Sequence, residues 1–294
     1  MKKAIIFGAA GQDGFYLDAL LKKEGIEVIG VSRSGDFLRT DIGDAGEVIN
    51  LIKKAKPAYI FHLAANSTTR HDALFENHGT IATGTLNILE AVKDFSRGTK
   101  VFISGSGLQF VNEERPIKET DAFAANDAYS VSRIQSVYAA RYFRTLGIRA
   151  YVGYFFNHDS PLRSERHMAK KISAAAQRAS NGSEEKLEIG DLTAIKEWAF
   201  AGDIVKALWA FVNSEEVFEI CLANGEGHSI KEWADLCFGL AGLNADDYIV
   251  HVPGFISPYK SLVADNSLLK KSLGYVPEVS FHELAAMMMN TCRP

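Results

Sequence analysis

The sequence predicts an α/β fold, in which a Rossmann-type doubly wound parallel sheet is followed by a smaller α/β C-terminal domain. Two observations lead to this prediction. Short apolar runs alternate with amphipathic segments through the first half of the chain, as expected when helices cover both faces of a parallel sheet. A glycine-rich turn also follows the first apolar run directly and opens the first amphipathic segment.

The expected elements follow from the period of the apolar residues. In the first half, strands are expected at Ala4–Phe7, Glu27–Val31, Tyr59–Leu63, Val101–Ser104 and Arg149–Tyr154. The intervening helices are expected at Phe15–Lys23, Gly46–Lys54, Ile81–Phe95 and Tyr129–Leu146. Later elements are expected as helices at His167–Ala179, Asp203–Val212, Ile230–Leu240 and Phe281–Met289, and as strands at Phe218–Leu222 and Tyr248–Val252. The pattern predicts a first domain over residues 1–155, which also receives segments around 190–222, and a smaller domain made mainly of residues 156–294.

Composition narrows the class of protein. A formal net charge of -4 gives no attraction to a polyanion, so nucleic acid is not an expected partner. No apolar run is long enough to cross a membrane, and the N-terminal run stops at Gly8, too early for a signal peptide. The cysteines, Cys221, Cys237 and Cys292, are odd in number and lack metal-ligand spacing. We therefore expect a soluble cytoplasmic protein with reduced thiols and no metal.

The glycine-rich turn has the pattern G-x-x-G-x-x-G, formed by Gly8, Gly11 and Gly14 with Gln12 and Asp13 between them. Glycines in this position allow a tight turn and let backbone amides approach a pyrophosphate at a helix N-terminus. The strand–turn–helix context predicts a dinucleotide-binding domain of the Rossmann type. The alternative is an ordinary turn rich in glycine.

The segment after the second expected strand bears on the choice of cofactor. It carries Arg33 between two serines, where an NAD-binding protein usually has an acidic residue. A guanidinium suits a 2′-phosphate, so NADP(H) is preferred over NAD(H); the alternative is a surface arginine, with Asp36 on the ribose. Asp41 and Ile42 are expected at the adenine, and Leu63, Ala64 and Ala65 beside the cofactor, although either stretch would also suit plain packing.

Tyr129 and Arg133 lie four residues apart on one expected helical face. A nearby cation favours the phenolate form of a tyrosine, which suits acid–base chemistry. Here the chain resembles the extended short-chain dehydrogenase/reductase family, whose signature is Tyr-x-x-x-Lys, with Arg133 in place of the lysine. The resemblance implies that Ser104 or Ser106 bonds the substrate. Without the rest of the chain, the Tyr/Arg pair would be read as a surface pair.

Within that family the chain resembles the GDP-mannose 4,6-dehydratase branch nearly end to end. The matching segments are Gly11–Gly14, Phe156–Pro161, Gly190–Leu192, Lys196–Trp198, Asp203, Gly225–Ser229 and Leu273–Pro277. The resemblance implies a nucleotide-diphosphate sugar as substrate, GDP-linked in preference, with its diphosphate contacted by Asn157 and paired with Lys170 and Lys196. The alternative for the two lysines is a solvated surface role. A homodimer formed by the helices at 81–95 and 129–146 is also implied.

Two glycines depart from that branch. Dehydratases carry Ser-Thr-Ser-Glu-Leu-Tyr-Gly where this chain has Ser104 to Phe110, so Gly105 replaces the threonine and Gly107 the acid/base glutamate. The family's R-P-x-E stretch is also altered, at residues 257–260. Glycine cannot transfer a proton, whereas a hydride step needs only a nicotinamide, a proton donor and a group that orients the carbonyl. We therefore expect an NADP-dependent 4-ketoreductase or dehydrogenase for a GDP-linked deoxy or heptose sugar. The alternatives are a 4,6-dehydratase with a substituted acid/base, and a non-catalytic protein that binds sugar nucleotide or cofactor.

Overall fold

The computed structural model describes residues 1–255 and 257–290. Its largest sheet has the order β10-β5-β4-β3-β1-β2, with every neighbouring pair parallel. The strands are β1 (Lys3–Phe7), β2 (Glu27–Val31), β3 (Tyr59–His62), β4 (Lys100–Ser106), β5 (Arg149–Phe155) and β10 (Glu219–Leu222). This sheet confirms the predicted α/β fold.

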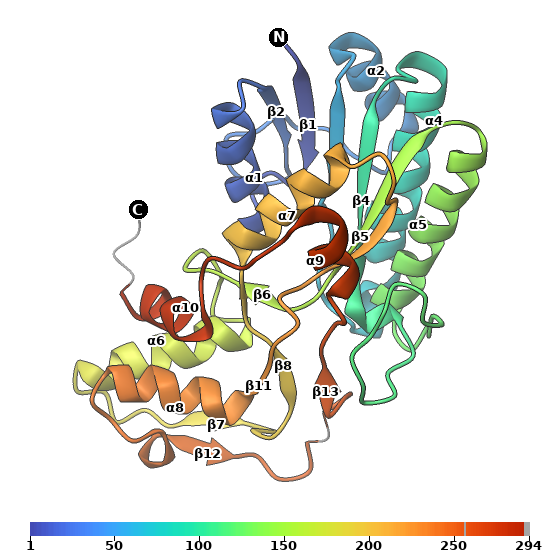
Figure 1. Ribbon diagram of the computed structural model, residues 1–294. Coiled ribbons are helices and arrows are strands. Elements are labelled where there is room, and N and C mark those ends of the chain that lie inside the picture. Colours follow the sequence, from blue (N-terminus) through green and yellow to red (C-terminus); the bar gives the residue numbers. More distant parts are fainter. Residues whose placement is uncertain (256, 291–294) are drawn as a thin grey trace.

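Helices cover both faces of the sheet (Figure 1). One face carries α2 (Ala45–Ala55), α4 (Gly84–Phe95) and α5 (Ala128–Thr145), and the other carries α1 (Gln12–Lys23) and α7 (Ala201–Asn213). Short helical turns lie between β3 and α4, at His71–Ala73, α3 (Leu74–Asn77) and a π-helical stretch, His78–Thr83, and another follows β4 at Gly107–Gln109.

The strands read as continuous apolar runs because their alternate residues enter two different cores. On β1, Ile5 and Phe7 belong to the core under α2, α4 and α5, whereas Ala4 and Ile6 belong to the core under α1 and α7. Side chains alternate between the two faces of a strand, so a strand covered on both faces must be apolar at every position.

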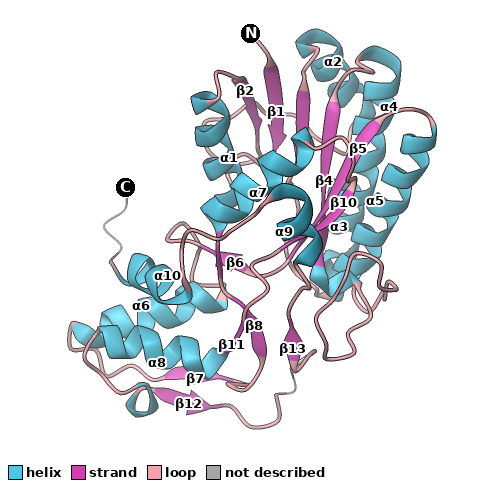
Figure 2. Ribbon diagram, viewed as in Figure 1, coloured by secondary structure: helices cyan, strands magenta, loops and turns pink. Residues whose placement is uncertain are grey.

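The smaller domain lies below the large sheet in Figure 2. It packs three helices around a third core. These are α6 (Met168–Ser180), α8 (Ile230–Leu240) and α10 (Phe281–Met289). Trp198 and Trp233 stack at the centre of that core, with ring centroids 4.5 Å apart. The remaining elements are α9 (Ser267–Leu273), a short turn at Ala245–Asp247, and the strands β6 (His158–Asp159), β7 (Leu187–Ile189), β8 (Ile195–Glu197), β9 (Ala199–Phe200), β11 (Gly227–Ser229), β12 (Ile249–His251) and β13 (Ser261–Leu262).

Of the short strands of this domain, only β12 was predicted, at Tyr248–Val252. The others have two or three residues each, which is too short to display a period of two. The long elements agree with the expectations within a few residues, and the domain boundary near residue 155 stays a prediction. Cys221 and Cys237 are free and buried, while Cys292 lies outside the described residues. Within residues 1–255 and 257–290, no helix has the length and apolarity to span a membrane.

The topology places a crevice at one edge of the large sheet. From β1 the chain moves to β2 on one side, and it then returns to β3 on the other side of β1. Loops that leave the carboxyl ends of these strands diverge, and ligands of open α/β sheets bind where they part. The loops after β1, β2, β3 and β4 all start at this edge.

Candidate active site

The glycine loop after β1 is packed too closely for side chains. Gly8 has a φ of +93°, and a Cβ there would lie 2.8 Å from the backbone nitrogen of Ala64. A Cβ on Gly14 would lie 2.6 Å from the carbonyl oxygen of Gly8. Gly11 is the N-cap of α1 and offers no capping side chain. The loop is thus bare backbone in front of a helix N-terminus, the arrangement that receives a phosphate.

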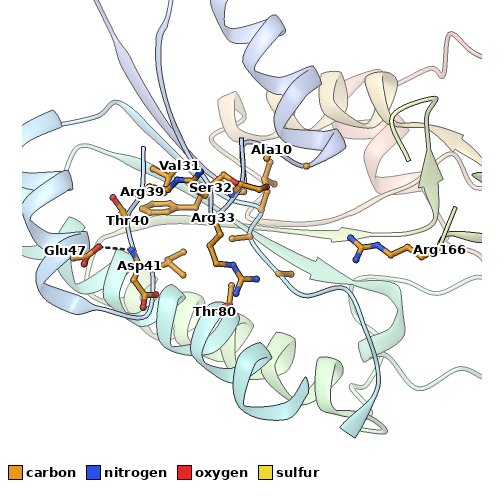
Figure 3. A pocket seen from close by; sticks show the side chains of 18 residues that line it. Ala10, Val31, Ser32, Arg33, Arg39, Thr40, Asp41, Glu47, Thr80 and Arg166 are labelled. Carbon is orange, nitrogen blue, oxygen red and sulfur yellow. Dashed lines mark hydrogen bonds between the residues drawn. The ribbon is translucent and has the colours of Figure 1, made fainter. Parts of the chain in front are cut away.

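A cavity of about 690 Å³ opens beside this loop (Figure 3). Every residue that the sequence predicted for the cofactor lies in its lining except Gln12, Asp13 and Gly14. The lining includes Gly8, Gly11, Arg33, Asp41, Ile42, Leu63, Ala64 and Ala65. It also includes residues that the sequence did not predict, notably Arg39, Glu47, Thr80 and Arg166.

Arg33 enters this cavity as one member of an ion pair. Its Nη2 lies 2.8 Å from Oε1 of Glu76, and the other oxygen of Glu76 accepts a hydrogen bond of 2.8 Å from Asn66. Hydrogen bonds from Arg33 and then Asn66 lower the pKa of Glu76. Nearby, Arg39 donates hydrogen bonds to the carbonyl oxygens of Ser32 and Gly35. The cavity therefore has two guanidinium groups close to the end of β2, and one of them has a carboxylate partner.

Asp41 and Ile42 lie at the same end of the cavity. The backbone nitrogen of Asp41 donates a hydrogen bond of 2.7 Å to Glu47, drawn as a dashed line in Figure 3. Ile42 is buried beneath this loop and contacts Gly84 at the start of α4. Arg166 enters from the opposite side of the cavity, on the loop after β6 (Figure 3).

A second cavity of about 340 Å³ adjoins the first and shares Ala10, Gly11, Leu63, Ala65 and Arg166 with it. Ser104 from β4 and Tyr129 and Arg133 from α5 all line it. Residues that are far apart in the chain are therefore brought together as the sequence predicted. Ser106, the other candidate serine, is outside the lining and caps the short turn after β4 instead.

Arg133 is buried and holds Tyr129 and Ser104 together. Its Cζ lies 4.9 Å from the centroid of the Tyr129 ring, and its Nη1 donates a hydrogen bond of 2.6 Å to Oγ of Ser104. The hydroxyl of Ser104 in turn donates to the carbonyl oxygen of His62, at 2.8 Å. Arg133 Nε is buried without a hydrogen-bond partner. The Arg133 guanidinium therefore contributes a buried positive charge to the lining of this cavity.

Aromatic rings fill the space at Gly105 and Gly107, the two glycines that the sequence predicts at the dehydratase threonine and glutamate positions. A Cβ on Gly105 would lie 2.5 Å from Cδ1 of Tyr154. A Cβ on Gly107 would lie 2.8 Å from Cε1 of Phe156. Both rings are buried, so no space is left for a threonine or a glutamate.

Gln12 and Asp13 join the glycine loop to the segment after β5. The Gln12 side chain donates to the carbonyl oxygen of His158 and accepts from Ser160. His158 has its Nδ1 2.7 Å from the carbonyl oxygen of Phe156 and its Nε2 2.9 Å from Asp13. Because both ring nitrogens face acceptors, the charged imidazolium satisfies this site best.

The pKa of Asp13 is lowered and the pKa of His158 is raised, because each side chain stabilises the charged form of the other. Burial alone raises the pKa of Asp13, but the charge and hydrogen bond of His158 outweigh it and lower the pKa. Burial likewise lowers the pKa of His158, and the Asp13 carboxylate outweighs it and raises the pKa. The two side chains therefore form an ion pair in which His158 is buried and Asp13 is partly buried.

The remaining wall of the second cavity is basic. Arg163 and Arg166, on the loop before α6, line it together with His167. Burial, followed by the charges of Arg163, Arg166 and Lys196, lowers the pKa of His167 to about 4, against the attraction of Asp159. These three residues were not predicted from the sequence, although the closely spaced basic residues after the Phe156–Pro161 segment were a usable signal.

The three predicted substrate residues lie outside the linings of both cavities. Lys196 is buried, with its ammonium 4.3 Å from the centroid of the Trp198 ring, and burial lowers its pKa. Asn157 has a buried side-chain oxygen without a hydrogen-bond partner, and Lys170 lies on α6. Their contacts with a substrate stay predictions.

A family model described as GDP-mannose 4,6 dehydratase matches residues 32–288 of this chain. The chain belongs to the GDP-mannose 4,6-dehydratase family. GDP-mannose 4,6 dehydratase 2 of Arabidopsis thaliana is 32% identical over 321 residues, which cover 98% of this chain and 86% of that protein. The GDP-mannose 4,6-dehydratase of Vibrio cholerae serotype O1 is 27% identical, with coverage of 98% and 92%.

Solved structures agree on the fold. UDP-glucose 4-epimerase of Thermotoga maritima superposes with a TM-score of 0.87 at 21% identity, covering 98% of this chain and 97% of that chain. dTDP-glucose 4,6-dehydratase of Bacillus anthracis, solved with NAD, superposes with a TM-score of 0.86 at 18% identity, covering 98% and 96%. Both superpositions cover nearly the whole of this chain, so the fold is shared from end to end.

Proposed function

We propose that this protein is an NADP-dependent nucleotide-sugar oxidoreductase, a 4-ketoreductase or dehydrogenase for a GDP-linked deoxy or heptose sugar. The observation that carries the proposal is a contrast between a cavity and the end of β4 beside it. Tyr129, Arg133 and Ser104 line the second cavity, next to the cavity proposed for the cofactor. Gly105 and Gly107, which are proposed to stand at the two dehydratase positions, lie outside that lining, and aromatic rings fill the space beside them. The groups needed for hydride chemistry are present, and those for elimination are missing from their family positions.

The glycine loop fits the cofactor, because it is bare backbone that borders the first cavity and leads into the N-terminus of α1, where amides can bind a pyrophosphate. Arg33 is the residue proposed to bind the 2′-phosphate of NADP(H). When bound, the cofactor supplies or accepts the hydride at C4 of the sugar.

Tyr129 is proposed to give its phenolic proton to the C4 oxygen during reduction and to take it back during oxidation. Arg133 lies over the ring and stabilises the negative charge left on the phenol oxygen. Ser104 reaches a substrate oxygen by turning its hydroxyl away from the carbonyl of His62. The basic wall formed by Arg163 and Arg166 is proposed to attract the diphosphate of the sugar nucleotide.

The test is to mix the purified protein with NADPH and a GDP-4-keto-6-deoxy-sugar and follow nicotinamide absorbance. We expect oxidation of NADPH, with a rate about 10²- to 10⁴-fold lower in Tyr129→Phe. The Phe variant should bind NADPH as the wild type does, since the phenol oxygen is its only change. Absence of oxidation in the wild type would refute the reductase activity.

A 4,6-dehydratase is the second candidate, favoured by the 32% identical Arabidopsis relative. It requires an acid/base other than the missing glutamate. Conversion of GDP-mannose to a 4-keto product without net consumption of cofactor would establish it. Tight cofactor binding without turnover on GDP-, dTDP- and UDP-sugars would instead indicate a non-catalytic binding protein.

A homodimer is proposed through α4 and α5. Leu86 on α4 and Tyr138 and Tyr142 on α5 are exposed apolar or aromatic side chains on these helices. Burying them between two copies in a four-helix arrangement would remove that apolar surface from water. Sedimentation should show a dimer for the wild type and a monomer for Tyr138→Glu combined with Tyr142→Glu.

A further inference from the structure

The second cavity lacks the glutamate, but it still contains groups that can move a proton. Among the described residues, its titratable lining groups other than arginine are Asp13, Tyr129, His158 and His167. Asp13 and His158 are engaged with each other, 2.9 Å apart. Tyr129 is assigned to the C4 oxygen. His167 is the group left over.

His167 is placed so that its ring is free to act. It precedes α6 as the N-cap residue, yet its side chain makes no hydrogen bond to the helix. The side chain is half-buried and lines the cavity together with Tyr129 and Ser104. Within residues 1–255 and 257–290, its ring has no hydrogen-bond partner. The side chain of an N-cap residue usually accepts a hydrogen bond from a backbone N–H of its helix, whereas the His167 side chain does not.

The charges around the ring control its protonation. Burial comes first, and Arg163 and Arg166 on its own loop and Lys196 on β8 add to it, so the pKa falls to about 4 against the pull of Asp159. The imidazole is therefore neutral near pH 7, with a lone pair available. An anionic ligand bound beside Arg163 and Arg166 offsets their charge and raises the pKa of His167. The ring thus becomes a stronger base when a nucleotide diphosphate is present.

We propose that His167 is the second proton-transfer group of this site, which removes a proton from a carbon next to the C4 carbonyl of a bound 4-keto nucleotide sugar. The proposal rests on the proposed function for its substrate class. It gives the chain a replacement for the glutamate that Gly107 removed, at a different place in the fold.

The step balances without a further reactant. A ring nitrogen of His167 takes the proton from C3 or C5, and the C–H electron pair forms a carbon–carbon double bond. The C4 carbonyl electrons move to its oxygen, which Tyr129 protonates to give an enol. Reversal returns a proton to carbon. Because the imidazole N–H exchanges with solvent, the sugar acquires solvent hydrogen at that carbon.

The experiment measures deuterium uptake. The protein is incubated in D₂O with a GDP-4-keto-6-deoxy-sugar and NADP⁺, which fills the cofactor cavity without supplying hydride, and the sugar is examined by NMR. We expect uptake at C3 or C5 in the wild type and a rate at least about 10²-fold lower in His167→Asn. His251→Asn is the matched control, because His251 is an exposed histidine on β12 outside both cavity linings.

Parallel assays separate the proposals. NADPH oxidation should persist in His251→Asn, and the thermal unfolding of His167→Asn should match that of His251→Asn. Uptake at the wild-type rate in His167→Asn would overturn the role of His167. A wild type that oxidises NADPH without deuterium uptake would overturn it too, while leaving the reductase function intact. Uptake without NADPH oxidation would support His167 and refute the reductase. A wild type that shows neither reaction refutes both.

Discussion

Two segments at the same edge of the sheet each carry a pair of glycines, and the space beside each pair is filled differently. In the loop after β1, Gly8 and Gly14 are bare because neighbouring backbone occupies the space, and this closeness shapes a phosphate site. At the end of β4 and just after it, Gly105 and Gly107 are bare because aromatic side chains occupy the space. The first pair belongs to a loop that borders a cavity. The second pair is predicted to stand in place of the dehydratase threonine and glutamate. A glycine therefore has to be interpreted from what lies against it.

The largest effect is expected from Gly8→Ala. The new Cβ would meet the backbone of Ala64 at 2.8 Å, and the positive φ adds strain. We expect NADPH binding to be lost and the free energy of unfolding to fall by roughly 1–3 kcal/mol more than in Gly25→Ala. Gly25 is the control because it also has a positive φ, of +71°, with nothing within 4 Å of its Cβ position. Fluorescence titration and chemical unfolding measure the two quantities, and equal losses in both variants would contradict the close-approach argument.

The second prediction concerns pH and the buried pair that holds the glycine loop to the segment after β5. The raised pKa of His158 means that its contribution is complete below about 6.5 and is lost as pH rises through the folded-state value. The lowered pKa of Asp13 means that its contribution is present above about 3.8 and is lost as pH falls through the folded-state value. The pair therefore stabilises most between these limits.

Chemical unfolding of the wild type and His158→Gln at several pH values measures the stability that the pair contributes. The difference in unfolding free energy between wild type and variant should reach roughly 1.5–3 kcal/mol near pH 5–6 and shrink as pH rises. His251→Gln should show no such trend, because His251 is exposed. A difference that grows steadily above pH 7 would mean that His158 is neutral in the folded protein.

The third prediction tests the aromatic filling of the β4 segment. Gly105→Ala places a methyl group 2.5 Å from the Tyr154 ring, so it should destabilise the protein by roughly 1–3 kcal/mol. In a Tyr154→Leu background the same change should cost less, since the ring is gone. A double-mutant cycle by chemical unfolding measures this coupling, and strictly additive losses would show that the ring does not limit position 105.

The smallest effect is expected from Glu76→Gln. Glu76 neutralises Arg33, the proposed 2′-phosphate ligand, through an exposed ion pair of 2.8 Å. Its removal should tighten NADPH binding about two- to fivefold and leave NADH binding unchanged. Paired titrations with the two cofactors measure the ratio, and Arg33→Ala should move it the other way. Equal changes for both cofactors would place the 2′-phosphate away from Arg33.

Features that depend on one local pattern of residues were predictable from the sequence. The glycine loop, the continuous apolar strands and the Tyr129–Arg133 spacing were all readable, and the structure puts these residues at adjoining cavities. Prediction was weaker where placement depends on packing. Ser104 and Ser106 looked equivalent, but only Ser104 lines the cavity, because the chain turns after β4 and uses Ser106 as a cap.

The sequence by itself determined the fold class and the presence of a dinucleotide loop, because both depend on periodicity and on residues adjacent in the chain. It also singled out Gly105 and Gly107 as positions without a side chain. Only the tertiary structure decided what fills the space beside them, since Tyr154 and Phe156 reach these glycines from the neighbouring strand and the segment after it. The tertiary structure also placed His167 in the lining of the cavity that Tyr129 lines. Burial and surrounding charge, which set the chemistry of an imidazole, arise from packing between distant segments and have no signature in a single stretch of sequence.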